Sequence, residues 1–143
     1  MALSPKHIIG RITKVDFPRL GALQISAKVD TGAYRTVVHC EWAKVIRVRG
    51  ERRLKVLFQL PGGVEKTIRF RKFNRRTIKN SFGEKESRYC VSLQMNIEGH
   101  AVRSSVSLTD RSGMRYPVLI GRKTLRGRFL VDVAGSERSA GHT

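Results

Sequence analysis

Hydrophobic and polar residues alternate along most of this chain in short runs, which is the pattern of half-buried β-strands. Turn-forming residues separate the runs, and Pro61-Gly62-Gly63 is the clearest such turn. Many short strands with closely spaced turns favour an all-β sandwich or closed barrel. The pattern predicts strands over residues 7–15, 22–29, 36–39, 42–48, 54–60, 64–73, 88–97, 101–108, 118–120 and 129–133, with one short C-terminal helix over residues 123–127.

The composition fits a single globular domain. The chain has 143 residues, of which 40% are hydrophobic, so it can bury a genuine core. No apolar run approaches the length of a membrane-spanning helix, and the first residues lack the apolar segment of a signal peptide. We therefore expect a cytoplasmic protein with no membrane partner. Residues 1–134 form the predicted domain, and we expect the small, polar residues 135–143 to be a disordered tail.

Positive charge dominates the chain. It has 29 Lys and Arg against 11 Asp and Glu, a formal net charge of +18. Such a protein attracts polyanions at long range, and the basic residues run through residues 47–79 instead of forming a tail. By charge alone, nucleic acid, an acidic membrane surface and an acidic polypeptide are the candidate partners, although we do not expect the membrane to be one. A surface tuned for solubility is the plain alternative.

The most informative motif is Asp30-Thr31-Gly32-Ala33, which follows an alternating apolar run over residues 25–29. A strand there delivers a carboxylate into a glycine turn, the geometry that the catalytic aspartate of an aspartic protease needs. In that chemistry one carboxylate takes a proton from a water and another gives a proton to the substrate carbonyl. An Asp-Thr-Gly triplet is also a good ordinary turn, so the motif alone leaves both interpretations open.

A second motif changes the balance. The stretch Leu119-Ile120-Gly121-Arg122 is an apolar strand that ends in glycine and enters a helical turn. It resembles the element of retropepsins whose strand crosses under the aspartate turn and supports it. More narrowly, residues 27–39, 78–88 and 108–132 resemble the bacterial family labelled "putative ATP-dependent zinc protease". The resemblance implies a retropepsin-like closed barrel of short antiparallel strands and an aspartic peptidase activity, with Asp30, Thr31 and Gly32 as catalytic residues.

The zinc and ATP of that label find no support in the residues. The chain has no His-Glu-x-x-His, and its four histidines are isolated. His39 and Cys40 are adjacent, but neighbours on a strand point to opposite faces and make poor co-ligands. No glycine-rich turn is followed by Lys-Ser or Lys-Thr with the spacing of a nucleotide loop. We therefore expect no metal and no cofactor.

One aspartate turn leaves the pair of carboxylates incomplete, because the length allows only one lobe. We expect the second Asp30 from an identical subunit, in a homodimer with two-fold symmetry. Two carboxylates about 3 Å apart repel by roughly 5 kcal/mol at an effective dielectric of about 20, so the pair would hold one proton near neutral pH. An internal partner, Asp110 or Asp132, is the alternative.

Retropepsins close a β-hairpin flap over the substrate. The candidate here is the segment of about residues 69–90, with its tip near Ser81-Phe82-Gly83. Its basic residues would face or rim the substrate groove, unless they lie on the outer face, and the sequence leaves both arrangements open. We predict substrate contacts from the turn, the flap and the Gly-Arg step, at Ala33, Tyr34, Arg75, Arg76, Lys79, Phe82 and Arg122.

The sequence departs from the retroviral pattern at Tyr34, where retroviral enzymes carry the aspartate that pairs with the arginine of the Gly-Arg step. Arg122 thus loses its usual partner and is a candidate to bind a substrate carboxylate, unless another local acid satisfies it. The bacterial family is also associated with glutamate ligases that extend proteins with glutamate chains. The resemblance therefore implies a peptidase for acidic, polyglutamate-like polypeptides, which a charge of +18 would attract.

A binding module without catalysis is the main alternative. A small basic barrel can bind RNA or DNA through aromatic rings interleaved with basic residues, and Phe70, Phe73 and Phe82 are the candidate rings. Aromatic residues make up only 7% of the chain, alternation turns Phe70 inward, and a carboxylate beside phosphate is unfavourable. We therefore favour a peptidase, with nucleic-acid binding or silent peptide binding as alternatives.

Overall fold

The computed structural model describes residues 6–79 and 82–135 of the chain. Within these ranges the chain forms strands almost throughout, and α1 (Arg122–Leu125) is a single turn of α-helix. The all-β class predicted from the alternating pattern is confirmed. No helix among the described residues is long and apolar enough to cross a membrane.

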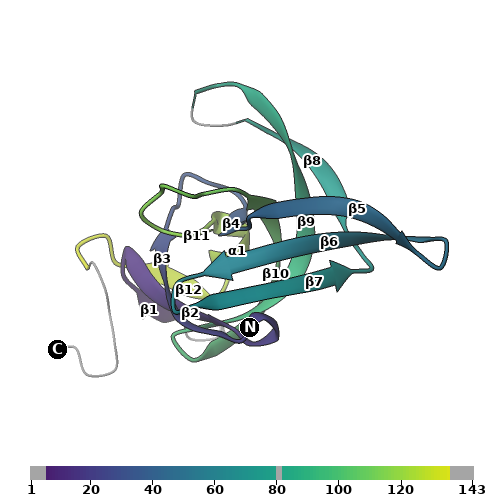
Figure 1. Cartoon of the computed structure of the whole chain (residues 1–143). Coiled ribbons are helices and arrows are strands. Elements are labelled where there is room, and N and C mark those ends of the chain that lie inside the picture. The colour runs from purple at the N-terminus through teal and green to yellow at the C-terminus, as the bar shows by residue number, and fades with distance from the viewer. Residues whose placement is uncertain (1–5, 80–81, 136–143) are drawn as a thin grey trace, which may run out of the picture.

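Six strands close a barrel at the centre of the molecule (Figure 1). Each strand pairs with the next, and the last pairs back with the first, so no free edge remains between them. In order around the barrel, the strands are β10 (His100–Thr109), β4 (Thr36–His39), β11 (Val118–Ile120), β3 (Ala22–Val29), β2 (Ile12–Phe17) and β9 (Lys85–Ile97).

The barrel is mixed, which corrects the expectation of uniformly antiparallel strands. Strand β11 lies between β3 and β4, parallel to β3 and antiparallel to β4. Strands β4 and β10 are also parallel. The reason is that β11 arrives from about 80 residues downstream and fills the gap that the chain leaves between β3 and β4.

A three-stranded antiparallel sheet packs against the barrel. It consists of β5 (Trp42–Val48), β6 (Glu51–Leu60) and β7 (Val64–Phe70), and it lies to one side in Figure 1. Alternate residues of β6, from Leu54 to Leu60, are buried in the same core as the barrel residues Phe17 and Ile97. The hydrophobic face that the sequence pattern predicts for β6 is therefore the face that is buried.

The hairpin of β8 (Asn74–Lys79) and the first half of β9 stands clear of the barrel and bends over one of its ends (Figure 1). It corresponds to the predicted flap, although it begins at Asn74 and not near Arg69. Ser81, one of the predicted tip residues, lies outside the described residues. Phe82 is 88% exposed, and Gly83 has the positive φ of 80° that turns the chain back toward β9.

The remaining elements differ from the predicted boundaries by a few residues. The strand expected over residues 7–15 is two strands, because the chain breaks at Gly10 and Arg11 after β1 (His7–Ile9). The turn expected at residues 16–21 begins later, since Phe17 is fully buried and stays in β2, and η1 (Pro18–Leu20) follows. β12 (Phe129–Val131) pairs in parallel with β1. Of the predicted tail, only Gly135 is described, and the boundary at residue 134 stays a prediction.

We predict that Phe58→Ala, which empties a fully buried site between the three-stranded sheet and the barrel, costs about 3–5 kcal/mol of unfolding free energy. Leu23→Ala is the control, because Leu23 is 68% exposed and its truncation should cost less than about 0.5 kcal/mol. Urea unfolding measures both. Equal losses would contradict a core shared by the sheet and the barrel.

Candidate active site

Asp30 follows directly after β3, and backbone hydrogen bonds fix its position. Its N–H donates to the carbonyl of Ile120 at 2.9 Å, which extends the parallel pairing of β3 with β11 by one residue. The carboxylate oxygen Oδ1 accepts the N–H of Gly32 at 3.0 Å. A Cβ on residue 32 would approach this oxygen to 3.2 Å, so glycine gives the carboxylate the closest access to that N–H. The turn therefore presents a half-buried carboxylate held by main-chain contacts.

The Gly-Arg step after β11 supports this turn, as the resemblance to retropepsins implied. The N–H of Arg122 donates to the carbonyl of Ala33 at 2.9 Å, and the N–H of Lys123 donates to the carbonyl of Tyr34 at 2.8 Å. Gly121 lies so close that a Cβ there would be 2.6 Å from the backbone carbon and oxygen of Arg35. Only glycine fits this contact without displacing the backbone.

A buried hydroxyl network under the turn was not predicted from the sequence. Thr124 of α1 shares hydrogen bonds with Thr36 of β4 at 2.6 Å and with Ser104 of β10 at 2.9 Å. Thr36 also accepts the N–H of Gly121 at 3.1 Å. These three side chains are buried, so the network joins the helical turn to two barrel strands without water. Nothing in the local sequence reveals it, because the three residues are up to 88 positions apart.

Arg122 contacts the aspartate turn itself. Its Nη1 donates to the carbonyl of Thr31 at 2.9 Å, and its guanidinium lies 5.8 Å from the centre of the Tyr34 ring. The guanidinium of Arg35 lies on the same ring at 5.6 Å. A carbonyl and an aromatic ring thus take the place of the missing aspartate, in the manner of cation–π pairs. The proposed contact of Arg122 with a substrate carboxylate stays a prediction.

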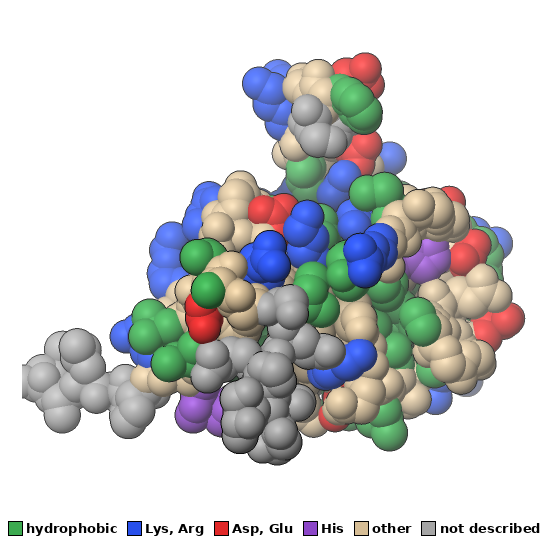
Figure 2. Space-filling view, turned by 90° about the vertical axis from the view of Figure 1, so that its left-hand side faces the viewer, with side chains coloured by type: hydrophobic (Ala, Val, Ile, Leu, Met, Phe, Trp, Pro, Cys, Tyr) green, Lys and Arg blue, Asp and Glu red, His purple; other side chains and the backbone are tan. Residues whose placement is uncertain are grey.

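A pocket of about 570 Å³ joins Asp30 to the hairpin. Of the predicted substrate contacts, the pocket includes Ala33, Tyr34 and Lys79. Lys and Arg side chains gather on the body of the molecule below the projecting hairpin (Figure 2). The described residues that line it come from the aspartate turn, from the strands β4, β8, β9, β10 and β11, and from the loop after β10: Asp30, Gly32, Ala33, Tyr34, Arg35, Val37, Thr77, Ile78, Lys79, Arg88, Ser107, Arg111, Met114 and Leu119.

Four predicted contacts lie outside this lining. Arg75 stacks on the ring of Tyr89 at 5.0 Å, and Arg76 and Phe82 are exposed on the hairpin. Arg122 is the fourth, engaged with the turn as described. Substrate contacts from these four residues stay predictions.

The pocket contains three arginines that the sequence analysis missed: Arg35, Arg88 and Arg111. Arg35 could have been found, since it directly follows Tyr34, which the sequence analysis had placed at the substrate. Arg88 and Arg111 could not, because their approach to Asp30 depends on the pairing of β9 with β2 and of β10 with β4, which are distant in sequence.

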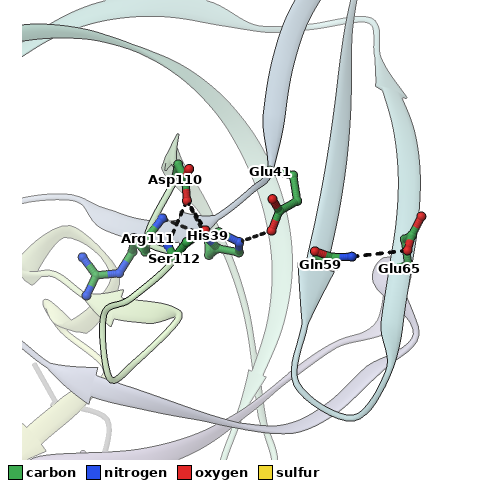
Figure 3. Close-up of polar contacts among 7 residues, drawn as sticks. All are labelled: His39, Glu41, Gln59, Glu65, Asp110, Arg111 and Ser112. Atoms are coloured by element: carbon green, nitrogen blue, oxygen red, sulfur yellow. Dashed lines mark hydrogen bonds and ion pairs between the residues drawn. The ribbon is translucent and has the colours of Figure 1, made fainter.

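His39 ties the loop after β10 to the barrel (Figure 3). Its Nδ1 accepts the backbone N–H of Arg111 at 2.7 Å, so the proton of the neutral ring lies on Nε2, which donates to Glu41 at 3.0 Å. Asp110 lies 3.7 Å from the same ring and accepts the N–H of Ser112 at 2.8 Å. The Ser112 hydroxyl, then its N–H, lowers the pKa of Asp110 below its usual value.

The two internal partners considered for Asp30 do not line its pocket among the described residues. Asp110 belongs to the His39 cluster, and Asp132 accepts the N–H of Ala134 at 3.0 Å in a turn after β12. Each carboxylate thus has a local structural role. An internal dyad gains no support from this arrangement.

A model of the RimB-like family, described as retropepsin-like aspartic endopeptidase RimB, matches residues 8–140. The chain belongs to this family. The resemblance inferred from the Asp-Thr-Gly-Ala turn and the Leu-Ile-Gly-Arg stretch is thereby confirmed.

Two curated relatives of this family member are both named probable alpha-L-glutamate ligase. The protein from Shewanella halifaxensis is 33% identical over an alignment of 134 residues that covers 92% of this chain and 29% of the relative. The protein from Desulfotalea psychrophila is 29% identical over an alignment of 142 residues, gaps included, that covers 90% of this chain and 28% of the relative. The chain therefore spans less than a third of the length of these relatives.

The fold also has a counterpart of known structure. The crystal structure of a protein of unknown function from Legionella pneumophila superposes with a TM-score of 0.75, at 23% identity, and covers 93% of this chain and 98% of that one. At this identity the match supports the fold alone.

Metal ligands do not gather anywhere in the part of the chain that is described, where no group of three His, Cys, Asp or Glu could hold an ion. Cys40 and Cys90 are free and buried. Burial first, then Asp110 and Glu41, raises the pKa of the Cys40 thiol to about 12, and burial also raises the pKa of Cys90. Neither is the low-pKa thiolate that serves as a nucleophile or a metal ligand.

We predict that Gly121→Ala costs about 3 kcal/mol of unfolding free energy, because its Cβ would press on the Arg35 backbone. Gly50→Ala is the matched control: Gly50 has a φ of 81° and open space around it, so only about 1 kcal/mol of conformational strain is expected. Thermal or urea unfolding compares the two. A Gly121 variant as stable as the Gly50 variant would contradict the close approach.

Proposed function

We propose that this protein is an aspartic endopeptidase in which two Asp30 carboxylates activate a water to hydrolyse peptide bonds. The observation that supports it most is the placement of Asp30. Its carboxylate is held by the Gly32 N–H at one end of the pocket that the β8–β9 hairpin overlies. A retropepsin-like family and a cleft with one acidic lining residue both agree with this role.

The proposed reaction needs one ionised and one protonated carboxylate. The ionised Asp30 takes a proton as the water oxygen attacks the carbonyl carbon, and the other Asp30 gives its proton to the carbonyl oxygen. The tetrahedral diol then collapses. The Asp30 that took the water proton gives it to the nitrogen as the C–N bond breaks, and the other Asp30 takes a proton from a diol hydroxyl. A carboxylic acid and an amine leave, and the pair is back in its starting state, with one carboxylate ionised and one protonated.

The second carboxylate comes, in this proposal, from an identical subunit across a two-fold axis. Asp30 is the one acidic residue among the described residues that line the pocket, so a single chain offers half of the dyad there. Thr31 and Gly32 are exposed beside it, where the matching turn of a partner would meet them. The role of Thr31 as a catalytic residue is part of the same proposal.

The proposed substrate is an acidic, glutamate-rich polypeptide. Arg35, Lys79, Arg88 and Arg111 line the pocket against Asp30 alone, and the whole chain carries a charge of +18. In the relatives named as glutamate ligases, a region similar to this chain shares a polypeptide with the remainder of the ligase. That association supports glutamate as the substrate residue. The proposed compartment is a reducing one such as the cytoplasm, where the two free cysteines would stay reduced.

Nucleic-acid binding is the weaker candidate. Of the three rings considered for base stacking, Phe70 is only 4% exposed. Phe73 is half-buried against Tyr89 at 6.2 Å and beneath Arg52 at 5.5 Å. Only Phe82 is fully presented to solvent. One exposed ring is a poor platform for a single strand, which is usually bound by stacking on several rings.

We predict that Asp30→Asn lowers the rate of hydrolysis of a glutamate-rich peptide by at least about a thousand-fold, because the amide cannot take the proton of the attacking water. Asp16→Asn is the control, since Asp16 binds the N–H of Gln24 on the barrel surface and does not line the pocket. Mass spectrometry of the products gives both rates. An active Asp30→Asn protein would overturn the proposal.

We also predict that Asp30→Asn subunits inhibit wild-type subunits when the two are unfolded together and refolded. If each dyad spans two chains, an equal mixture should keep about one quarter of the activity of the same amount of wild-type protein, because about one quarter of random dimers carry both carboxylates. Sedimentation at the assay concentration measures the assembly. Retention of half the activity would indicate independent sites and would refute the shared dyad.

A further inference from the structure

Two of the three pocket arginines, Arg35 and Arg111, lie at separate places along the same pair of strands. Arg35 precedes β4, while Arg111 follows β10, and β4 and β10 run in parallel with Thr36 opposite Val106 and His39 opposite Thr109. The three residue steps from Thr36 to His39 cover roughly 10 Å. The two guanidiniums therefore approach the cleft from opposite ends of these strands.

The Arg35 end of the pocket is a built site with a spare polar group. Arg35 donates from Nη1 to the hydroxyl of Ser105 at 3.2 Å, which fixes the side chain along β10. Ser107, two residues further on the same side of β10, also lines the pocket. Its buried hydroxyl is the one side-chain polar atom among the described residues that is both fully buried and without a hydrogen-bond partner. Such an atom favours a polar ligand group, because an unpaired buried hydroxyl is costly.

The Arg111 end is held by the His39 cluster. The backbone N–H of Arg111 donates to the buried His39 ring, and its side chain extends to the opposite side from Glu41 (Figure 3). The side-chain Nε donates to the carbonyl of Tyr116 at 3.0 Å, a bond that does not use the two terminal nitrogens. This guanidinium is therefore anchored at its base, and its outer edge has the planar fork that matches a carboxylate.

The charges around Arg111 leave an excess of positive charge. Burial and the nearby Arg88 lower the pKa of Arg111, whereas Asp30 raises it, so both neighbours are close enough to act on it. Arg88 itself pairs with Glu86. Among the described residues of the lining, Asp30 is then the one acid that opposes Arg35, Lys79 and Arg111, and an incoming carboxylate would relieve their mutual repulsion.

We propose that Arg111 and Arg35 form two distinct carboxylate-binding subsites, so that the enzyme reads acidic side chains at two positions on each side of the cleaved bond. Arg111 serves the position closer to Asp30, and Arg35, with Ser107, serves the other. This deepens the proposed function and rests on it. It predicts selectivity for runs of acidic residues, since one acidic side chain would occupy only one of the two subsites.

A positional scan tests this directly. The substrate is a peptide with a run of glutamates, and each glutamate in turn is replaced by glutamine, which keeps the shape and removes the charge. For the wild-type protein we expect kcat/KM to fall about 10- to 100-fold at two positions on each side of the cut, the effect of losing a charged hydrogen bond. Arg111→Met should abolish the sensitivity at one position of each pair, and Arg35→Met at the other.

Arg47→Met is the matched control for charge. Arg47 lies on β5 and donates to the carbonyl of Gly50, so its loss lowers the net charge equally without touching the pocket. Its scan should match that of the wild type. Equal losses in all three variants, or scans that stay unchanged in Arg35→Met and Arg111→Met, would overturn the proposal. If Arg111→Met proves unstable, Arg111→Lys takes its place. It keeps the charge but not the planar fork, so its sensitivity to glutamine at that position should lie between those of the wild type and a variant without the charge.

Binding measurements separate this proposal from the peptidase itself. The glutamate peptide of the scan and its glutamine-substituted versions are labelled with a fluorophore. Each is titrated with Asp30→Asn protein, alone or combined with Arg35→Met or Arg111→Met, and fluorescence anisotropy reports the affinity. Position-specific losses caused by Arg35→Met and Arg111→Met would support the subsites even if no preparation cleaved any peptide. Cleavage that depends on Asp30 but is equally fast for glutamate and glutamine peptides would leave the peptidase standing and refute the subsites.

Discussion

The close contact between Gly121 and the backbone at Tyr34 and Arg35 is the constraint on which the site depends. It brings the end of β11 against the turn after β3, so that Ile120 accepts the Asp30 N–H and Arg122 donates to Ala33. A side chain at residue 121 would separate these two segments. The position of the carboxylate is thus decided by backbone packing, and the hydroxyl of Thr124 holds the same junction from below.

This junction was visible in the sequence because each half carries a strong local signal. Asp30 and Gly32 form a turn after an alternating strand, and Gly121 ends a short apolar strand. The class of the fold could be predicted for the same reason, as alternation marks β6 and the barrel strands alike. Parallel pairing could not be predicted, because the place of β11 between β3 and β4 depends on contacts about 80 residues apart.

The pocket residues also divide into those that the sequence could predict and those that it could not. Ala33, Tyr34 and Lys79 belong to segments that the sequence had marked, and all three line it. Arg111 reaches it through a loop whose position depends on the buried His39 ring, and Ser107 looks like any other serine of an exposed strand until its burial is known. A charge of +18 favoured an acidic partner over a surface tuned only for solubility, but it could not show which of the many basic residues line the pocket with Asp30.

Strand β9 has 13 residues. Its second half is a strand of the barrel, and its first half is one strand of the hairpin with β8. Pairing with β10 ends at Tyr89, so beyond that residue β9 is supported by β8 alone. The hairpin is therefore a continuous extension of a barrel strand, fixed to the barrel at one end only. Because only a two-stranded ribbon extends beyond Tyr89, any bending of the hairpin would be concentrated beside that residue, next to Arg88.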